Sequence, residues 1–102
     1  MIKVIEGFEV KPFADIEPIL QKIRTNAIQY PGFVSDESLI GYPEVSTVVL
    51  LSVRHNIDTW RIWENSTIRS KLYEQLRDLL EEEPRITIYT VWPAKIRTKD
   101  WQ

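Results

Sequence analysis

The fold is decided by a strand that runs directly into a helix, Val45-Ser-Thr-Val-Val-Leu-Leu-Ser-Val53 and then His55-Asn-Ile-Asp-Thr-Trp-Arg-Ile-Trp-Glu-Asn-Ser66. The first segment is β-branched and apolar, which is typical of a strand that is buried on both faces. Asn56 is the expected N-cap of the helix, and Asp58 in the first turn complements the helix dipole. The pair of segments predicts a strand-to-helix junction in the middle of the chain.

The helical segment after this junction contains a change of phase. Trp60 and Trp63 lie on one side of it with Ile57, because the three recur every third residue. A second apolar stripe is rotated by roughly 115° from the first on a continuous helix, and its members are Ile68, Leu72, Leu76 and Leu79. Ser66 lies between the two stripes and can cap a second helix. We therefore predict two short helices with a break at residues 64–67.

The other elements follow from their periodicity. Apolar and polar residues alternate from Ile2 to Val10, which predicts a first strand. A helical stripe runs from Phe13 to Tyr30, with Asp15 as the expected N-cap, and Pro31-Gly32 ends this helix. Two hairpin strands come next, and alternation over Arg85–Trp92 predicts the last strand.

The resulting order, β-α-β-β-α-β, predicts an α+β fold of the ferredoxin-like type. In this fold an antiparallel sheet carries both helices on one face. Both faces of Val45–Arg54 are apolar, and a large exposed apolar sheet face is rare in monomers. We therefore expect a homodimer that packs sheet against sheet. Residues 1–92 form the expected domain, and residues 93–102 form a basic C-terminal tail.

Composition excludes several classes of function. The 102 residues include 13 basic and 15 acidic side chains, so the net charge of -2 offers no footprint for nucleic acid. Cysteine is absent, and His55 is the only histidine, so the usual ligand sets of catalytic zinc or iron cannot be built from one chain. The longest purely apolar run, Val48-Val-Leu-Leu51, is far too short to span a membrane. We expect a cytoplasmic protein without a metal or membrane partner.

Pro31-Gly32-Phe33, the apolar third strand and Trp60-x-x-Trp63-x-x-Ser66 resemble the antibiotic biosynthesis monooxygenase family over about residues 1–92. The resemblance implies a dimeric α/β barrel with a ligand pocket between the helices and the sheet of each subunit. It further implies an oxygenase that acts on electron-rich phenols or quinols without a metal or flavin.

A branch of this family degrades haem, and the resemblance to that branch is weaker. Its members use an asparagine on the first strand, a tryptophan at the position that resembles Trp63, and a histidine on the following helix. Here the corresponding positions fall at or near Gly7 and near Tyr73, so only the tryptophan matches. Haem degradation is therefore less expected than cofactor-free oxygenation.

The expected substrate site follows from the resemblance and from the helix break. Trp63 and Trp60 are expected to form a wall of the pocket, and the polar contacts are expected from Asn65, Ser66, Arg69 and Tyr73. A cofactor-free oxygenase needs a dry pocket, an orienting surface and a proton acceptor, and no residue is identified as that acceptor.

The leading function is a cofactor-independent monooxygenase, and the alternative is a non-catalytic dimer that binds a small ligand or is purely structural. An apolar cavity with a positioned polar group favours the enzyme, whereas a helix layer packed solid against the sheet favours the alternative.

Overall fold

The structure is a computed structural model that describes residues 1–92. Its elements, in chain order, are β1 (Ile2–Glu9), α1 (Glu17–Ala27), β2 (Phe33–Ile40), β3 (Thr47–Arg54), α2 (Ile57–Glu64), α3 (Thr67–Arg77) and β4 (Arg85–Thr90). The predicted tail, residues 93–102, lies outside the described residues. Within residues 1–92 no helix is both long enough and apolar enough to cross a membrane.

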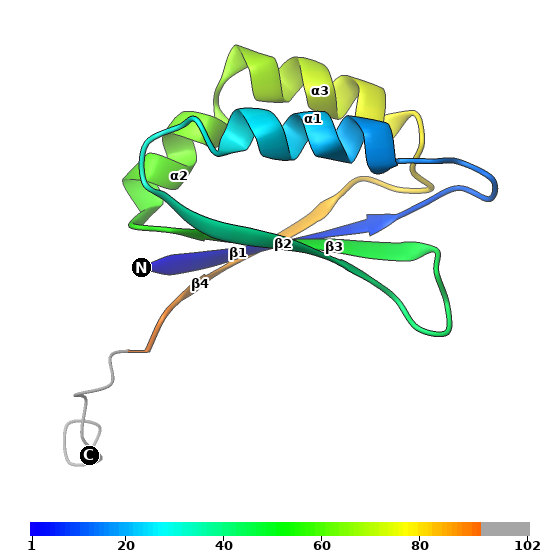
Figure 1. Cartoon of the computed structure of the whole chain (residues 1–102), viewed down its shortest axis with the longest axis horizontal. Coiled ribbons are helices and arrows are strands. Elements are labelled where there is room, and N and C mark those ends of the chain that lie inside the picture. The colour runs from blue at the N-terminus through cyan, green and yellow to red at the C-terminus, as the bar shows by residue number, and fades with distance from the viewer. Residues whose placement is uncertain (93–102) are drawn as a thin grey trace.

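The strands of the described chain form one antiparallel sheet in the order β2-β3-β1-β4. All of the helices in Figure 1 lie on the same side of this sheet. The two central strands, β1 and β3, are far apart in the sequence and pair along their whole length, from Ile2 with Arg54 to Glu9 with Thr47. The predicted α+β, ferredoxin-like fold is confirmed.

The sheet has one face under the helices and one outer face. On β1 the helix-facing residues are Ile2, Val4, Glu6 and Phe8, which are all buried, while the alternate positions are exposed or half-buried. On β3 the outer face carries Val49, Leu51 and Val53. The outer face is therefore apolar at its centre, where Val49 and Leu51 are half-buried and Val53 is buried.

The predicted break between two helices is confirmed at residues 65 and 66. Asn56 caps α2 in a capping box. Its side chain accepts a hydrogen bond from the Thr59 amide, and the Thr59 hydroxyl oxygen accepts one from the Asn56 amide. Ser66 caps α3 by accepting a hydrogen bond from the Arg69 amide. Each helix therefore buries its own stripe, although Ile57 is exposed rather than sharing the buried side of α2.

Helix α1 begins later than the sequence predicts. Its N-cap is Ile16, without a side-chain cap, and Asp15 instead accepts a hydrogen bond from the Glu17 amide just outside the helix. At the other end, the buried Arg54 of β3 donates from Nη2 to the Ala27 carbonyl over 3.0 Å. A cation at this place complements the negative end of the helix dipole and fixes α1 to the sheet.

The turn after α1 is packed against the start of α2. Gly32 has a positive φ of 79°, a conformation that glycine adopts without strain. A Cβ atom built on Gly32 would overlap the side chain of Thr59. The α1–β2 turn and the capping box of α2 therefore occupy adjoining space.

Candidate functional site

The candidate site is centred on Glu6, a carboxylate in the middle of β1 that faces the helices. Only 1% of Glu6 is exposed, and it lies between the buried apolar residues Val4 and Phe8 on the same face of the strand. An unpaired carboxylate in such a place would be strongly destabilising, so buried carboxylates are found with partners. Glu6 has its partners on α3.

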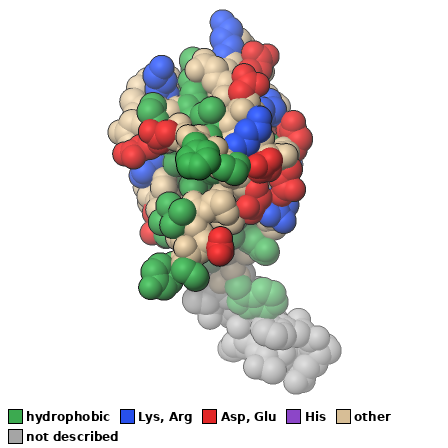
Figure 2. All heavy atoms as spheres, turned by 90° about the vertical axis from the view of Figure 1, so that its right-hand side faces the viewer, with side chains coloured by type: hydrophobic (Ala, Val, Ile, Leu, Met, Phe, Trp, Pro, Cys, Tyr) green, Lys and Arg blue, Asp and Glu red, His purple; other side chains and the backbone are tan. Residues whose placement is uncertain are grey.

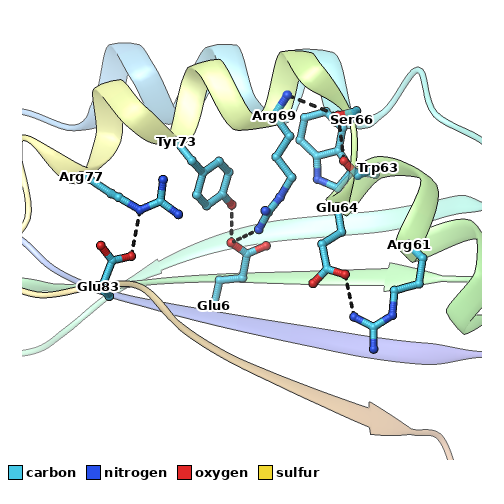
Figure 3. Close-up of polar contacts among 9 residues, drawn as sticks. All are labelled: Glu6, Arg61, Trp63, Glu64, Ser66, Arg69, Tyr73, Arg77 and Glu83. Atoms are coloured by element: carbon cyan, nitrogen blue, oxygen red, sulfur yellow. Dashed lines mark hydrogen bonds and ion pairs between the residues drawn. The ribbon is translucent and has the colours of Figure 1, made fainter.

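Arg69 and Tyr73 lie one helical turn apart on α3 and both reach Glu6 (Figure 3). The Tyr73 hydroxyl donates a short hydrogen bond to Oε2 of Glu6, and Nη2 of Arg69 lies 3.5 Å from the same oxygen. The guanidinium carbon of Arg69 also lies 3.9 Å from the centre of the Tyr73 ring, a cation–π contact. Arg69 and Tyr73 are 8% and 2% exposed, so the three side chains form a cluster shielded from water, here called the Glu6 cluster.

Burial changes the ionisation of two members of the cluster. Burial raises the pKa of Glu6 above its ordinary value, although the charge of Arg69 and the hydrogen bond from Tyr73 oppose this. Burial, followed by the adjacent charge of Glu6, raises the pKa of Tyr73 well above its ordinary value, so Tyr73 remains a neutral donor. A carboxyl whose pKa lies closer to neutrality is better suited to accept a substrate proton and release it again.

Two buried N–H groups at the Glu6 cluster have no acceptor within residues 1–92: Nε of Arg69 and Nε1 of Trp60. The guanidinium carbon of Arg69 lies 5.5 Å from the centre of the Trp60 ring, so both donors belong to one packed group. Leaving a buried donor unpaired costs about 1–3 kcal/mol. Such groups are rare in folded proteins, and they are expected where a ligand or water supplies the missing acceptor.

The structure brings together Trp60, Arg69 and Tyr73 among the predicted site residues. Trp63 is also buried, at 2% exposed, and its ring packs against Tyr30 with 5.0 Å between ring centres. That Trp63 lines a ligand pocket stays a prediction.

Asn65 and Ser66 are helix-end residues in the structure. Asn65 is the exposed C-cap of α2. Ser66 donates from Oγ to the Trp63 carbonyl over 2.7 Å and accepts from the Arg69 amide over 3.2 Å. Ser66 therefore holds the backbone of Trp63 next to that of Arg69, and direct contact of Asn65 or Ser66 with a ligand stays a prediction.

Glu6 was missed by the sequence analysis, which placed the functional position of the first strand at or near Gly7. Gly7 lies on the outer face, whereas Glu6 faces the helices. The signal was present in the sequence, because Glu6 occupies the same phase of the alternation as Ile2, Val4 and Phe8. A charged residue in phase with the buried face of a strand indicates a buried charge that needs a partner.

Two hollows of the described structure lie away from the Glu6 cluster. One of about 290 Å³ lies between α1 and the β2–β3 hairpin, and its lining is Val10, Ala14, Asp15, Ile16, Glu17, Leu20, Ser38, Leu39, Ile40, Val45 and Val48. It is mainly apolar, and Figure 2 shows hydrophobic side chains exposed at this end of the molecule. A groove of about 440 Å³ runs between α1 and β2 beside the Arg24–Asp36 ion pair. Neither hollow is lined by the predicted site residues.

Around Glu6 itself the helices pack directly on the sheet. Phe8 meets the edge of Tyr73, with ring centres 6.4 Å apart, and both residues are almost fully buried. A ligand therefore reaches the cluster only when α2 or α3 moves away from the sheet. No group of three or more histidine or acidic side chains that could hold a metal ion occurs within residues 1–92.

Solved structures of the same fold include several oxygenases. An antibiotic biosynthesis monooxygenase superimposes with a TM-score of 0.82 at 15% identity, over 91% of this chain and 100% of its own. SnoaB, a cofactor-independent oxygenase from Streptomyces nogalater, superimposes with a TM-score of 0.82 at 18% identity, over 94% of this chain and 97% of its own. Rv0793 from Mycobacterium tuberculosis superimposes with a TM-score of 0.81 at 16% identity, over 93% of this chain and 98% of its own.

The fold is thus the one found in antibiotic biosynthesis monooxygenases, so the resemblance expected from the sequence is confirmed for the fold. No protein-family model matches the sequence. No curated protein matches it either. The chain therefore shares a fold with these proteins at an identity too low to carry over an activity or a substrate.

Proposed function

We propose that this protein is a cofactor-independent monooxygenase that acts on a small electron-rich aromatic substrate of the phenol or quinol type. The observation that carries this proposal is the Glu6 cluster, a buried carboxyl beside two buried donors that lack acceptors. It supplies the proton acceptor that a cofactor-free oxygenase needs. The shared fold with SnoaB supports the same reaction class.

Each residue has a definite role in the proposed reaction. Glu6 accepts the proton of a phenolic hydroxyl, and Tyr73 and Arg69 hold the carboxyl in place for that transfer. The phenolate then supplies the electrons that reduce O₂. One oxygen atom enters the ring as a quinone carbonyl in place of hydrogen, and the other leaves as water, so atoms and electrons balance. Trp60 and Trp63 supply aromatic surfaces for the substrate ring.

The alternative function is a non-catalytic dimer of the same fold that binds a small ligand. The specific observation in its favour is the direct packing of the helices on the sheet around Glu6, while the apolar cavity of about 290 Å³ lies elsewhere. In that case a ligand would bind between α1 and the β2–β3 hairpin, far from any proton acceptor of the Glu6 cluster.

The proposal includes a homodimer and a cytoplasmic location. The apolar centre of the outer sheet face, formed by Ile5, Val49, Leu51 and Val53, supports packing against a second copy. The absence of cysteine from the sequence is consistent with a reducing compartment. No nucleic-acid or membrane partner forms part of the proposal.

The experiment is a screen of oxygen consumption with quinols and polyphenols, without added metal, flavin or haem. We expect turnover by the natural protein and a loss on the order of 10²–10⁴-fold in kcat for Glu6→Gln, the usual contribution of a general base. Glu74→Gln is the matched control, because Glu74 is an exposed carboxylate on α3, and it should keep full activity. Turnover that survives in Glu6→Gln would remove Glu6 from the mechanism.

A further inference from the structure

The apolar hollow between α1 and the β2–β3 hairpin is built like a small binding site. Its volume of about 290 Å³ suits a ligand smaller than a drug-sized one, whose sites span about 300–1,000 Å³. Buried side chains of Ile16, Leu20 and Val48 line its inner part. Its lining also includes large apolar side chains that are 47–66% exposed, namely Leu39, Ile40 and Val45. Exposed apolar residues that gather around a hollow indicate a surface that binds something.

This hollow adjoins a second one of about 320 Å³ at the turn that follows β1. The two share Val10, Ala14 and Val45, so they form one elongated groove, here called the α1–hairpin groove. The second hollow is lined by one cation, Lys11, whose Nζ donates to the Asp78 carbonyl at the end of α3 over 3.0 Å. The groove can therefore take an elongated apolar body.

Phe13 lines the same groove in an unusual conformation. Its φ of 64° lies in the left-handed region, where a residue other than glycine is strained, and its side chain is fully exposed. The fold therefore gains no burial from this ring in return for the strain. Strained residues cluster at sites that bind ligands. The ring is free to contact an aromatic group or a cation that lies in the groove.

The charges that line the hollow between α1 and the hairpin are both negative. They belong to Asp15 and Glu17, and neither carboxylate forms an ion pair within residues 1–92. Arg24 shares a neighbouring hollow with Glu17, but its Nε and Nη2 both donate to Asp36. The N-terminus of α1 contributes only about half a positive charge, less than the two carboxylates together. The hollow therefore favours a ligand that carries a positive charge.

We infer that the α1–hairpin groove binds an amphipathic cation, an amine whose apolar body lies in the groove and whose charge lies beside Asp15 and Glu17. The Phe13 ring contacts the part of the apolar body that extends toward the turn after β1. This site does not depend on the proposed oxygenase reaction, because no residue of the Glu6 cluster lines the groove. It goes beyond both candidate functions by giving the ligand a chemical class.

The test compares three probes that share one apolar body: 4-phenylbutylamine, 4-phenylbutanol and 4-phenylbutyrate. Calorimetric titration at neutral pH measures their affinities, with the amine present as a cation and the acid as an anion. The amine should bind several-fold more tightly than the alcohol and about 10-fold or more tightly than the acid. Because both carboxylates are exposed, the advantage of the amine over the alcohol should shrink when the salt concentration is raised about tenfold.

A pair of substitutions identifies the charges that select the amine. Asp15→Asn combined with Glu17→Gln should lower the affinity for the amine to that for the alcohol and leave alcohol binding unchanged. Asp58→Asn combined with Glu74→Gln is the matched control, because it removes an acidic residue from the first turn of α2 and an exposed carboxylate from α3. Neither of these residues lines the groove, so the control should bind all of the probes normally.

Two further variants test the apolar contacts if the charge variant destabilises α1. Val45→Asn should weaken all of the probes several-fold, because Val45 lines both hollows. Ile62→Asn is its matched control, since Ile62 is an exposed apolar residue of α2 outside the groove. Phe13→Gly should weaken the amine several-fold without lowering the melting temperature, because glycine adopts a positive φ without strain.

The outcomes separate this inference from the proposed oxygenase. Equal affinities for the three probes, or amine binding that survives the loss of both carboxylates, would overturn the inferred site. An amine affinity that falls as the protein concentration rises would also overturn it, because a second copy of the chain would then cover the groove. Selective amine binding by a protein that consumes no oxygen with any quinol would retain the site and overturn the oxygenase.

Discussion

Arg54 and Glu6, two buried charged residues on the central strands, differ in which of their polar atoms have hydrogen-bond partners. Arg54 donates to the carbonyls of Ala27, Tyr30 and Pro31, so its two terminal nitrogens are used in holding the end of α1. Glu6 places both of its contacts on one oxygen and leaves the other free of partners within the described chain. Arg54 still leaves its buried Nε without an acceptor within the described chain, so an unpaired buried N–H also occurs away from the Glu6 cluster.

The raised pKa of Glu6 predicts a specific dependence of stability on pH. Its pKa lies above the value of 4.5 that it has without the fold, so between these two values the folded state binds more protons than the unfolded state. This contribution to stability is complete below about pH 4.5 and is lost as pH rises through the folded pKa. Glu6→Gln, which has no proton to lose, should not show this decline.

The measurement is chemical denaturation of the natural protein and Glu6→Gln at several pH values, with Glu74→Gln as the control for loss of one carboxylate. The free energy of unfolding of the natural protein should fall relative to that of Glu6→Gln as pH rises above about 4.5. A difference between the two proteins that is constant across the pH range would show that Glu6 titrates alike in the folded and unfolded chain.

The sequence analysis predicted Arg69 and Tyr73 of the Glu6 cluster as site residues but did not predict Glu6. Arg69 and Tyr73 were identified from the family resemblance and because they lie after the helix break that the sequence predicts. Their partner Glu6 is 63 residues from Arg69 in the chain, and neither composition nor periodicity states which strand position a helix residue will meet. The alternation on β1 could have shown that Glu6 is buried, but only the assembled sheet shows beneath which residues it lies.

The break between α2 and α3 sets the position of the site at the level of elements. Ser66 begins α3 and at the same time binds the carbonyl of Trp63 near the end of α2. One side chain therefore fixes the angle at which the helix with the indoles meets the helix with Arg69 and Tyr73. The break itself was predictable, because the two apolar stripes disagree in phase, and caps are local in sequence.

Ser66→Ala should therefore destabilise the protein by about 1 kcal/mol, the usual cost of losing an N-cap. It should also lower the turnover of a quinol substrate, since the cap holds the amide of Arg69 and Arg69 contacts Glu6. Ser70→Ala is the matched control, because Ser70 is exposed in the interior of α3 and alanine is the better helix former there. Equal stability of the two variants in denaturant titrations would show that the cap contributes nothing to α3.

At the scale of the whole molecule, the helices all lie on one face of the sheet, and the outer face has an apolar centre that they do not cover. The outer face carries Ile5 opposite Leu51 at the centre, with Val49 and Val53 on either side along β3. A dimer that buries this face should bury more than about 1,000 Å² in total, which is the usual size of a specific interface. The sequence could predict this need, because both faces of β3 are apolar, but not the relative orientation of two copies.

Leu51→Arg should convert the expected dimer into a folded monomer, because it places an unpaired charge in the centre of the proposed interface. Sedimentation at micromolar concentration measures the assembly, and circular dichroism checks that the variant is folded. Ile62→Arg is the matched control, since Ile62 is exposed on α2, and it should leave the dimer intact. Sedimentation of the natural protein as a monomer would contradict the prediction without any variant.

The contact between Gly32 and Thr59 limits how this domain can diverge in evolution. Any side chain at position 32 would push against Thr59, and Thr59 begins the helix that carries both indoles of the site. In evolution most exposed residues of α1 can be replaced freely. Gly32, however, can be replaced only after Thr59 has been replaced by a smaller residue. Because that second change removes half of the capping box, the two positions should change in a fixed order, with an intermediate in which α2 is poorly anchored. The position of the helix that carries Trp60 and Trp63 therefore depends on a turn that lies 28 residues or more earlier in the chain than either indole, at Gly32.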